Sequence, residues 1–550
     1  MGARITFITA ALAAVIALAA TSWARAADSL ATPAISLQRA DWRAALDQLR
    51  SELNAAPDVA ADFALSARRR SVAGNDPRRR PALLQLNGVT STIFTGIGRS
   101  PVPVLLPFDT AAYLGARRRG AVDPQTLPRY QADFQTDLFD AGPSGYDAVF
   151  SLAPEVTSGL PSRIFAKPVE VQITGSSITY DIADPAGGKG DPVKALSAQY
   201  PDLRRFIREG YVRYAFTRFG VPYVVSIQCL DSAPRPKRLA CREAYPIAER
   251  FLRALRVAGG QPARSAPEIA QLAAEQPSTL DADFSYRPPG DIVANSGARG
   301  QSGRADRIVY SQIRFPVDAP AYVHSQSFGR RRASDKLDQP RSQQPWSQYP
   351  WRDSFCEARD FNVGQCASGF GHQGQDIRPG ICPVRREGPD GCDPWRQRVL
   401  AVRDGVVIRS TRQQAVTIQV NSGTEHIRFR YMHMNPTAMD NDGLLNGRSL
   451  RAGEPIGVVS NYLDHPNGTT RHVHFDIQLF TRDGWIWVNP YMTLIAAYER
   501  LIGGRGREIG ADPEMAASPS PVTTGTIKAP AQAVSPLGPS ADAAVGRDRN

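Results

Sequence analysis

A chain of 550 residues is too long for one hydrophobic core, so we expect two or more domains. With 42% hydrophobic and 21% charged residues, the composition is that of a soluble globular protein. The net charge of +12 at pH 7 favours an anionic partner, such as nucleic acid, an anionic polymer of a cell envelope or a membrane surface.

The N-terminal segment has the pattern of a secretory signal peptide. One positive charge, Arg4, precedes an apolar stretch from Ile5 to Ala20, and a small-x-small cleavage pattern follows at residues 24–26. An uncleaved membrane anchor is the alternative, but the stretch is shorter than the about 20 residues that a spanning helix needs. We therefore expect a signal peptide over residues 1–26, no membrane span in the mature chain, and a mature protein in the periplasm or cell envelope. Export also argues against nucleic acid as the partner.

The six cysteines fit an exported chain. Cys229 and Cys241 flank a polar turn, and four more form a second group: Cys356, Cys366, Cys382 and Cys392. An even count in an oxidising compartment predicts disulfides. A four-cysteine zinc site is the alternative, but the close Cys-x2-Cys pairs of such sites are missing. The pairing within the second group stays open.

Residues 27–80 are predicted to form a helix followed by an arginine-rich linker. Over residues 36–53, apolar side chains recur at helical spacings of three and four: Trp42, Leu46, Leu49 and Leu53. Two arginine clusters follow, at 68–70 and 78–80, and we interpret them as part of an exposed linker.

Residues 81–260 are predicted to form an α+β domain with one disulfide. Three stretches, 102–110, 169–182 and 210–230, are rich in β-branched and aromatic residues, and 245–260 has helical spacing that ends at two glycines. The domain contains no histidine and its acidic residues are scattered, so nothing in it predicts catalysis. Its role stays open, and binding of a regulatory protein is one candidate.

The rest of the chain divides into a linker, a third region and a tail. Residues 261–305 are rich in Pro, Ala, Gly, Ser and charge, which predicts a linker. Residues 306–501 are rich in strand-forming stretches. Residues 502–550 are rich in proline and poor in apolar side chains, so they cannot bury enough surface to fold, which predicts a disordered tail.

Histidine is scarce and concentrated, because six of the seven histidines lie between His372 and His474. In RHVHFDIQLF, residues 471–480, His472 and His474 share one face of a predicted strand. The alternate residues share the other face, which suits burial: Val473, Phe475, Ile477 and Leu479. Two imidazoles on one strand face can converge on zinc. A strand with two surface histidines is the alternative.

Two upstream segments supply further candidates. In GFGHQGQDIRPG, His372 and Asp376 are four residues apart among glycines, so we expect a loop or extended segment that offers two kinds of zinc donor. In EHIRFRYMHM, strand parity places His426 on one face and His433 on the other, together with Ile427, Phe429 and Tyr431. We therefore expect His426 to lie outside the site.

This series of motifs resembles the lysostaphin/LytM-type zinc metallopeptidases, in which His-x3-Asp precedes a Tyr-x-His strand and then His-x-His. The likeness covers roughly residues 316–491. It extends to five further segments: SQSFG (325–329), VLAVRDGVVI (399–408), LRAGEPIGVVS (450–460), HVHFDI (472–477) and VNPYMTL (488–494).

The resemblance implies roles for individual residues. The ligands of one zinc ion per chain would be His372, Asp376 and His474. The non-ligand pair that acts on the water and the developing oxyanion would be His433 and His472. Asp476 shares the parity of His474 and is a candidate carboxylate partner for a ligand histidine, with a solvent-facing aspartate as the alternative.

The resemblance also implies a fold and a function. The expected fold class is mainly β, α+β and multidomain, with a C-terminal antiparallel β-sheet peptidase domain that has a groove, preceded by the α+β domain. The implied function is an exported zinc metalloendopeptidase that hydrolyses peptide bonds in the stem or cross-link of peptidoglycan. A non-catalytic peptidoglycan-binding or amidase-activating protein is one alternative, and an endopeptidase that acts on a protein is another. The complete set of five site residues favours an enzyme over a binding module.

Two segments depart from the family pattern. A cysteine-bounded loop, 382–392, follows Asp376, and residues 461–470 replace the short turn before His-x-His. These loops would shape the groove walls. His465 lies in the second of them and is expected on the surface.

Overall fold

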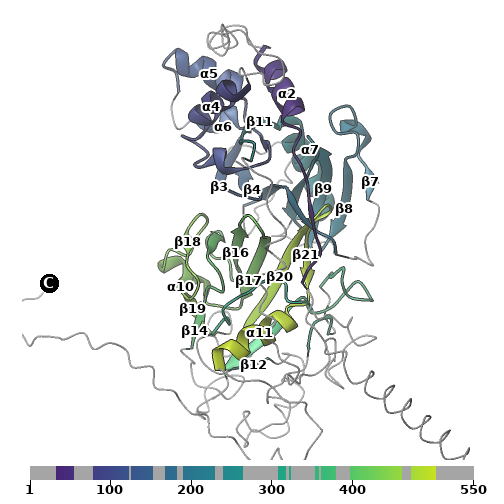
Figure 1. Cartoon of the computed structure of the whole chain (residues 1–550), viewed down its shortest axis with the longest axis vertical. Coiled ribbons are helices and arrows are strands. Elements are labelled where there is room, and N and C mark those ends of the chain that lie inside the picture. Colours follow the sequence, from purple (N-terminus) through teal and green to yellow (C-terminus); the bar gives the residue numbers. More distant parts are fainter. Residues whose placement is uncertain are drawn as a thin grey trace, which may run out of the picture. The chain divides into compact units, whose positions relative to one another are not determined.

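Two antiparallel β-sheets dominate the computed structural model (Figure 1), which has the β-rich α+β class that the sequence predicts. The described residues all belong to one compact unit, Met1–Glu508. They are 32–54, 79–122, 126–152, 168–182, 190–229, 239–263, 308–317, 321–323, 353–357, 359, 361–379, 397–460 and 472–502.

The first sheet has seven strands in the order β3-β4-β5-β10-β9-β8-β7, and all neighbours are antiparallel. The strands are β3 (Phe134–Gly142), β4 (Gly145–Leu152), β5 (Glu170–Ser176), β7 (Asp191–Pro192), β8 (Arg204–Arg208), β9 (Tyr211–Arg218) and β10 (Val221–Gln228). The stretches 169–182 and 210–230 lie in this region, so their predicted strands are confirmed. Their β-branched and aromatic residues fit a pleated, buried surface.

Several helices and a two-stranded sheet share one apolar core with the first sheet. The small sheet pairs β2 (Val104–Leu106) with β11 (Arg256–Gly259), and α2 and α4 contact β11. The helices are α2 (Trp42–Asn54), α4 (Arg79–Thr90), α5 (Thr110–Arg118), α6 (Leu127–Tyr130) and α7 (Tyr245–Ala254), with the 3-10 turns η1 (Ile97–Arg99), η3 (Lys194–Leu196) and η4 (Cys241–Ala244).

The helix predicted over residues 36–53 begins later than expected. Its first residue is Trp42, because Asp41 Oδ1 accepts hydrogen bonds from the backbone N–H groups of Arg43 and Ala44 and so caps the first turn. The preceding residues form strand β1 (Ile35–Leu37), which pairs with β6 (Ile178–Tyr180). A side-chain cap thus overrides the apolar spacing that suggested a longer helix.

Two other helix boundaries also differ from the prediction. Helix α7 ends at Ala254 and not at the glycines, because the next residues pair with β2 as strand β11. Helix α4 begins at Arg79, inside the predicted linker, and buries Leu83, Leu86 and Thr90 at helical spacing. Proline in its first turn, Pro81, is compatible with a helix start.

The second sheet follows the order β12-β13-β20-β17-β16-β15-β18, with β21 also paired to β20. Its strands are β12 (Ala321–Val323), β13 (Gln375–Pro379), β15 (Gly405–Ile408), β16 (Val416–Asn421), β17 (His426–Met432), β18 (Ser449–Leu450), β20 (Val473–Thr481) and β21 (Gly484–Val488). The remaining elements are the pair β14 (Arg398–Leu400) and β19 (Pro455–Val458), and helices α10 (Pro436–Asn441) and α11 (Tyr491–Ile502).

Strand β20 is central to the second sheet. Strand β17 pairs with one edge, while β13 and β21 share the other, β13 along residues 473–475 and β21 along residues 477–481. The odd-numbered residues of β20 face an apolar core, as predicted, together with those of β17: Ile427, Phe429, Tyr431, Val473, Phe475, Ile477 and Leu479. We call the opposite face, which carries His474, Asp476 and Gln478, the polar face.

Two disulfides are formed, Cys229–Cys241 and Cys356–Cys366, and no described cysteine is free. The second pairing settles one of the connectivities that the sequence left open. Cys382 and Cys392 lie outside the described residues, as do the predicted signal peptide, the first arginine cluster and residues 503–550. None of the described helices is long and apolar enough to cross a membrane.

Candidate metal centre

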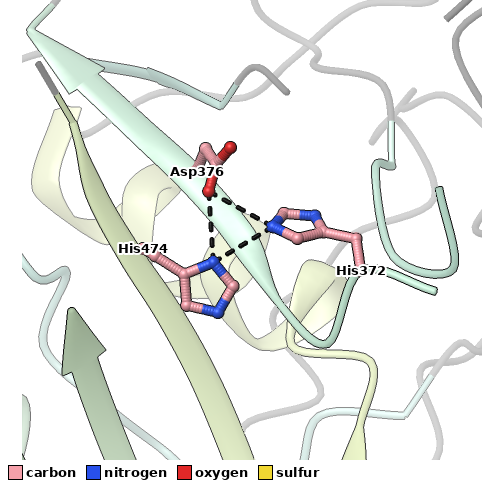
Figure 2. Close-up of side chains that lie close together, drawn as sticks. All are labelled: His372, Asp376 and His474. Atoms are coloured by element: carbon pink, nitrogen blue, oxygen red, sulfur yellow. Dashed lines mark hydrogen bonds and ion pairs between the residues drawn. The ribbon is translucent and has the colours of Figure 1, made fainter. Parts of the chain in front are cut away.

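The three predicted ligand residues come from two segments of the chain and meet on the polar face of the second sheet (Figure 2). Asp376 on β13 lies directly opposite His474 on β20 in the strand register. His372 lies just before β13, in the segment that follows the Cys356–Cys366 disulfide. All three are buried, with at most 2% of each residue exposed.

The potential ligand atoms lie close together. His372 Nε2 is 3.0 Å from His474 Nδ1, and Asp376 Oδ1 is 3.1 Å from that same His474 nitrogen. Asp376 Oδ1 is also 3.3 Å from His372 Nε2. One nitrogen of each histidine and one carboxylate oxygen therefore point at a common centre.

The other ring nitrogens show which of these atoms carry a lone pair. His372 Nδ1 lies 3.1 Å from the carbonyl oxygen of Ser354, which can only accept, so Nδ1 carries the proton. His474 Nε2 lies 3.2 Å from Asp476 Oδ2, a carboxylate oxygen, so Nε2 carries the proton there. In the neutral form of each ring, both inward-facing nitrogens carry the lone pair. Two lone pairs and a carboxylate oxygen at this spacing repel one another unless a cation lies among them.

This donor set fits zinc. Two imidazole nitrogens and one carboxylate oxygen are common zinc ligands, and three protein ligands leave a fourth position open, as in catalytic sites. Donor atoms bound to tetrahedral zinc at about 2.0–2.2 Å lie about 3.3–3.6 Å from one another. The observed separations of 3.0–3.3 Å are close to that spacing.

The surroundings of the candidate ligands Asp376 and His474 shift their pKa values. Burial alone would raise the pKa of the Asp376 carboxyl, but the neighbouring histidines, His472 first, hold that pKa well below its ordinary value. Burial alone would lower the pKa of His474, but its hydrogen bonds with Asp376 and Asp476 raise it. A proton therefore competes with a metal ion for this site.

Asp476, the candidate partner carboxylate, is buried and fully engaged. Its Oδ2 accepts from His474 Nε2 and, at 2.9 Å, from Arg430 Nε, while its Oδ1 accepts from Trp487 Nε1 at 3.1 Å. Burial alone would raise its pKa, but Arg430 and His474 lower it. A charged Asp476 in this setting fixes the orientation of the His474 ring.

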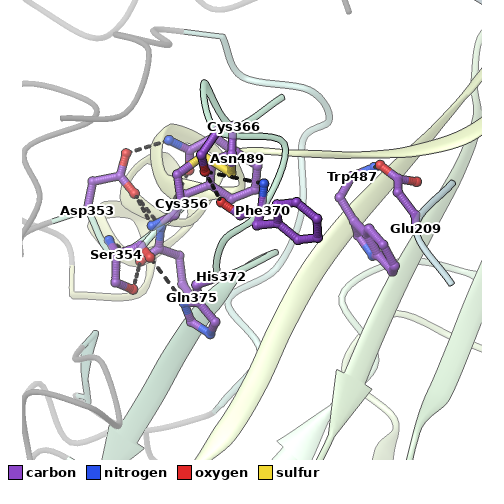
Figure 3. Close-up of a disulfide and its surroundings, with 12 residues drawn as sticks. Glu209, Asp353, Ser354, Cys356, Cys366, Phe370, His372, Gln375, Trp487 and Asn489 are labelled. Carbon is purple, nitrogen blue, oxygen red and sulfur yellow. Dashed lines mark hydrogen bonds between the residues drawn. A yellow bond between two sulfur atoms is a disulfide. The ribbon is translucent and has the colours of Figure 1, made fainter. Parts of the chain in front are cut away.

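A second polar network holds the loop that carries His372 (Figure 3). Gln375 Nε2 donates to Asp353 Oδ1 at 2.6 Å, Gln375 Oε1 accepts from Ser354 Oγ at 2.8 Å, and Asn489 donates to Asp353. These contacts set the position of the Ser354 carbonyl that orients His372. Gly374 is required beside them, since a Cβ there would lie 2.9 Å from His474 Nε2 and clash with the Phe475 carbonyl.

His433 and His472 lie next to the three candidate ligands. The His433 ring centroid is 4.7 Å from that of His472 and 6.2 Å from that of His474. His433 Nδ1 lies 3.3 Å from Gln414 Oε1, an acceptor that leaves the lone pair on Nε2. Burial, followed by the nearby histidines, lowers the pKa of His433 well below its ordinary value, which keeps the ring neutral. The predicted histidine pair is therefore adjacent to the centre.

The parity argument used for His426 and His433 was wrong. Residues Phe429 and Tyr431 face the apolar core, so strict alternation would have buried His433 there. His433 instead lies just past the end of β17 with a φ of 73°, and this turn brings its ring to the polar face. His426 belongs to the polar face by register, because Arg430 pairs with Asp476 and Met432 with His474.

His426 is nevertheless separate from the metal centre. Its Nε2 lies 2.7 Å from Oδ2 of Asp147, a residue of β4 in the first sheet. Oδ1 of Asp147 accepts from Arg428 at 3.0 Å and from Thr174 at 2.6 Å. We call Asp147, Thr174, His426 and Arg428 the interface cluster, because it joins the two sheets.

Several residues that surround the centre had not been predicted from the sequence: Glu209, Asp353, Ser354, Gln375, Gln414, Arg430, Trp487 and Asn489. Asn489 lies in the VNP segment of the resemblance, and Arg430 and Trp487 could have been found from strand parity once the register was known. No local pattern marks the others. His465 lies outside the described residues.

Comparisons with solved structures give three weak likenesses. A candidate glycyl-glycine endopeptidase, LytM, from Ruminococcus gnavus is 22% identical, with 24% of this chain and 48% of that chain covered and a TM-score of 0.17. Lysostaphin, an antimicrobial peptidase from Staphylococcus simulans, is 16% identical, with 31% and 58% covered and a TM-score of 0.16. Csd3 from Helicobacter pylori is 14% identical, with 52% and 68% covered and a TM-score of 0.16.

The chain thus spans about half the length of the first two structures, at TM-scores too low to show a shared overall fold. No protein-family model matches the sequence, and no curated protein matches it either.

Proposed function

We propose that this protein is an exported zinc metalloendopeptidase that hydrolyses peptide bonds in the stem or cross-link of peptidoglycan. The observation that carries the proposal is the convergence of two imidazole nitrogens and a carboxylate oxygen beside two further histidines. The choice of peptidoglycan as substrate rests on the sequence resemblance to lysostaphin/LytM-type enzymes.

The ligand residues have one task each. His372 Nε2, His474 Nδ1 and Asp376 Oδ1 would hold the zinc ion, while Ser354 and Asp476 keep the two rings in the correct tautomer. The chemistry that zinc supplies in such a site is polarisation of the scissile carbonyl and a lowered pKa for the attacking water.

The remaining histidines would move protons and stabilise charge. His433 is neutral and offers Nε2, so it can accept a proton from the attacking water. His472, whose ring lies 4.7 Å from that of His433, can donate a hydrogen bond to the oxyanion as it develops.

The exported location is supported by two independent features. The N-terminal sequence has the pattern of a signal peptide, and both described disulfides need an oxidising compartment to persist. We therefore place the mature protein in the periplasm or cell envelope, where peptidoglycan is its partner. The net charge of +12 suits an anionic polymer of this kind.

The deciding experiment is digestion of purified, cross-linked peptidoglycan with the mature protein, with the products resolved by mass. We expect cross-linked dimers to be converted to peptide-cleaved monomers, with no conversion by the Asp376→Ala variant. Free stem peptides with bare glycan would indicate amidase chemistry instead. If the protein sediments with peptidoglycan and releases nothing, it is a binding protein and the proposal is wrong.

A further inference from the structure

Trp487 joins the candidate metal centre to the first sheet by two hydrogen bonds that leave it in different directions. Its indole Nε1 donates to Asp476 Oδ1 at 3.1 Å. Its backbone N–H donates to Glu209 Oε1 at 3.3 Å. Trp487 lies on β21, which among the described strands pairs only with β20, so Glu209 occupies the outer edge of that strand. Figure 3 draws Trp487 and Glu209 next to each other.

Glu209 has an unusual backbone conformation and a buried, ion-paired side chain. It lies in the tight turn between β8 and β9 with a φ of 54°, a conformation that residues other than glycine seldom adopt. Its side chain is fully buried, and Oε2 pairs with Arg213 Nη2 at 2.9 Å. A strained, buried carboxylate that reaches across to another sheet is a candidate for a specific role.

From Trp487 the contacts lead directly to a candidate ligand. Asp476 Oδ1 is occupied by Trp487, and Oδ2 is shared between Arg430 and His474 Nε2. Loss of the Trp487 contact frees one side of the carboxylate to rotate. Because Oδ2 turns with it, the His474 ring loses the partner that fixes its angle and its tautomer.

We propose that Trp487 and Glu209 are positioning residues that hold His474 in the orientation for metal binding, through Asp476. In this proposal the first sheet helps to orient a metal ligand, because its Glu209 contacts Trp487. This inference rests on the proposed role of His474 as a ligand. Neither residue touches the substrate or the reacting atoms.

The chain provides a matched control two residues away. Trp485 lies on the same strand and the same face as Trp487, and its Nε1 donates to Thr174 Oγ1 of the first sheet at 3.1 Å. Thr174 donates its own hydrogen bond to Asp147 in the interface cluster, and not to Asp476. Trp485→Phe therefore also removes one buried indole hydrogen bond from β21, but it leaves the link from Trp487 through Asp476 to His474 intact.

The test compares zinc affinity, by competition with a chelator, and the absorption spectrum of the cobalt-substituted protein. We expect Trp487→Phe to weaken zinc binding by about 10–100-fold, the usual effect of losing a partner behind a ligand, and to shift the cobalt bands. Trp485→Phe should leave both measurements as in the wild type. Thermal unfolding of each variant checks that it is folded.

Glu209 is tested by two further variants. Glu209→Gln keeps an acceptor oxygen for the Trp487 N–H, so its zinc affinity should stay at the wild-type value even if stability falls. The double variant Glu209→Met with Arg213→Met removes the buried pair without leaving a lone charge. It should weaken zinc binding in the same direction as Trp487→Phe.

The outcomes separate this inference from the proposed function. If Trp487→Phe binds zinc as tightly as the wild type while Asp376→Ala does not, the positioning role is wrong and the metal centre stands. If Trp485→Phe weakens binding as much as Trp487→Phe, the effect is a general loosening and the positioning role is again wrong. A wild-type protein that binds no zinc overturns both.

Discussion

At each end of the polar face of the second sheet, a histidine lies beside a carboxylate, which at one end belongs to the first sheet. Asp376 and His474 lie at one end, with His372 beside them, and Asp147 and His426 meet at the other. His426 and Met432, the partner of His474, are six residues apart on β17, so the two places are separated by about 20 Å of strand. Both places contain histidine and aspartate, and they differ in the hydrogen-bonding partners of these side chains.

In the interface cluster every contact pairs a donor with an acceptor. The two oxygens of Asp147 accept hydrogen bonds from His426, Arg428 and Thr174, so no acceptor of the group faces another acceptor. In the candidate metal centre, neutral rings would place the lone pairs of His372 Nε2 and His474 Nδ1 opposite each other, with Asp376 as a third acceptor. Proton placement, and not the mere presence of histidine and aspartate, therefore separates a structural pair from a candidate metal site.

The largest expected difference between the candidate metal centre and the interface cluster appears when one carboxylate is removed from each. Asp376→Ala should lose zinc and all hydrolysis, because two neutral nitrogens alone do not hold the ion in an open site. Metal analysis should find about one zinc per wild-type chain and far less in the variant. Asp147→Asn is the control and should keep its zinc. Normal zinc in Asp376→Ala would refute the ligand assignment.

The next largest effect concerns the two histidines that are not read as ligands. His472→Ala and His433→Ala should retain zinc and lose turnover by about 10²–10⁴-fold, the usual contribution of a positioned proton-transfer group. His474→Ala should lose zinc and turnover together. Zinc content and initial rates measured on the same preparations give the pattern. A His472→Ala variant without zinc, beside a His474→Ala variant that keeps it, would invert the assignment.

The interface cluster should contribute stability and not catalysis. Asp147→Asn leaves Arg428 buried without its carboxylate, so we expect the free energy of unfolding to fall by about 3–5 kcal/mol. His426→Ala should cost less, because its Asp147 partner keeps Arg428. Urea denaturation measures both, and the rate per folded molecule should stay near the wild-type value. An effect on zinc content would mean that the two ends of the polar face are coupled.

The strand content could be predicted from the sequence because it depends on local pattern, whereas the candidate ligand set followed from the resemblance to lysostaphin/LytM-type enzymes. Alternation along residues 473–479 separates the apolar core from the polar face, and the three candidate ligands His372, Asp376 and His474 lie near one centre. The same alternation failed for His433, because it holds only inside a strand and that residue lies past the strand end at a positive φ.

The surroundings of the centre could not be predicted in this way. Ser354 is 18 residues from His372 and Glu209 is 278 residues from Trp487, and only the folded chain brings each pair together. The capping of α2 by Asp41 is a local signal that apolar spacing concealed. Long-range hydrogen bonds to backbone atoms leave no pattern in one sequence.

The smallest expected effect is a change in how the stability of the interface cluster depends on pH. Asp140 on β3 lies opposite Asp147 on β4, and burial, followed by the charge of Asp147, raises its pKa to about 6 from 3.8. Arg99 and His426 act in the opposite direction. For Asp147, burial alone would raise the pKa, but His426 and Arg428 lower it. The pKa of Asp140 is thus raised while that of Asp147, which lies opposite, is lowered.

The signs predict opposite responses to pH in the two variants. A folded-state pKa above the unfolded value means that the ionised Asp140 destabilises the fold, an effect absent below about pH 4 and complete above about pH 6. Asp140→Asn should therefore raise the free energy of unfolding by about 2–3 kcal/mol at pH 8 and leave it unchanged near pH 3.5. The stabilisation by Asp147 is complete above its unfolded pKa and is lost as the pH falls through its lower folded pKa, so the loss in Asp147→Asn should begin to shrink at about pH 3.5. Urea midpoints at the two pH values measure both, and an Asp140→Asn variant that is less stable at pH 8 would show that Asp140 is not strained by its neighbour.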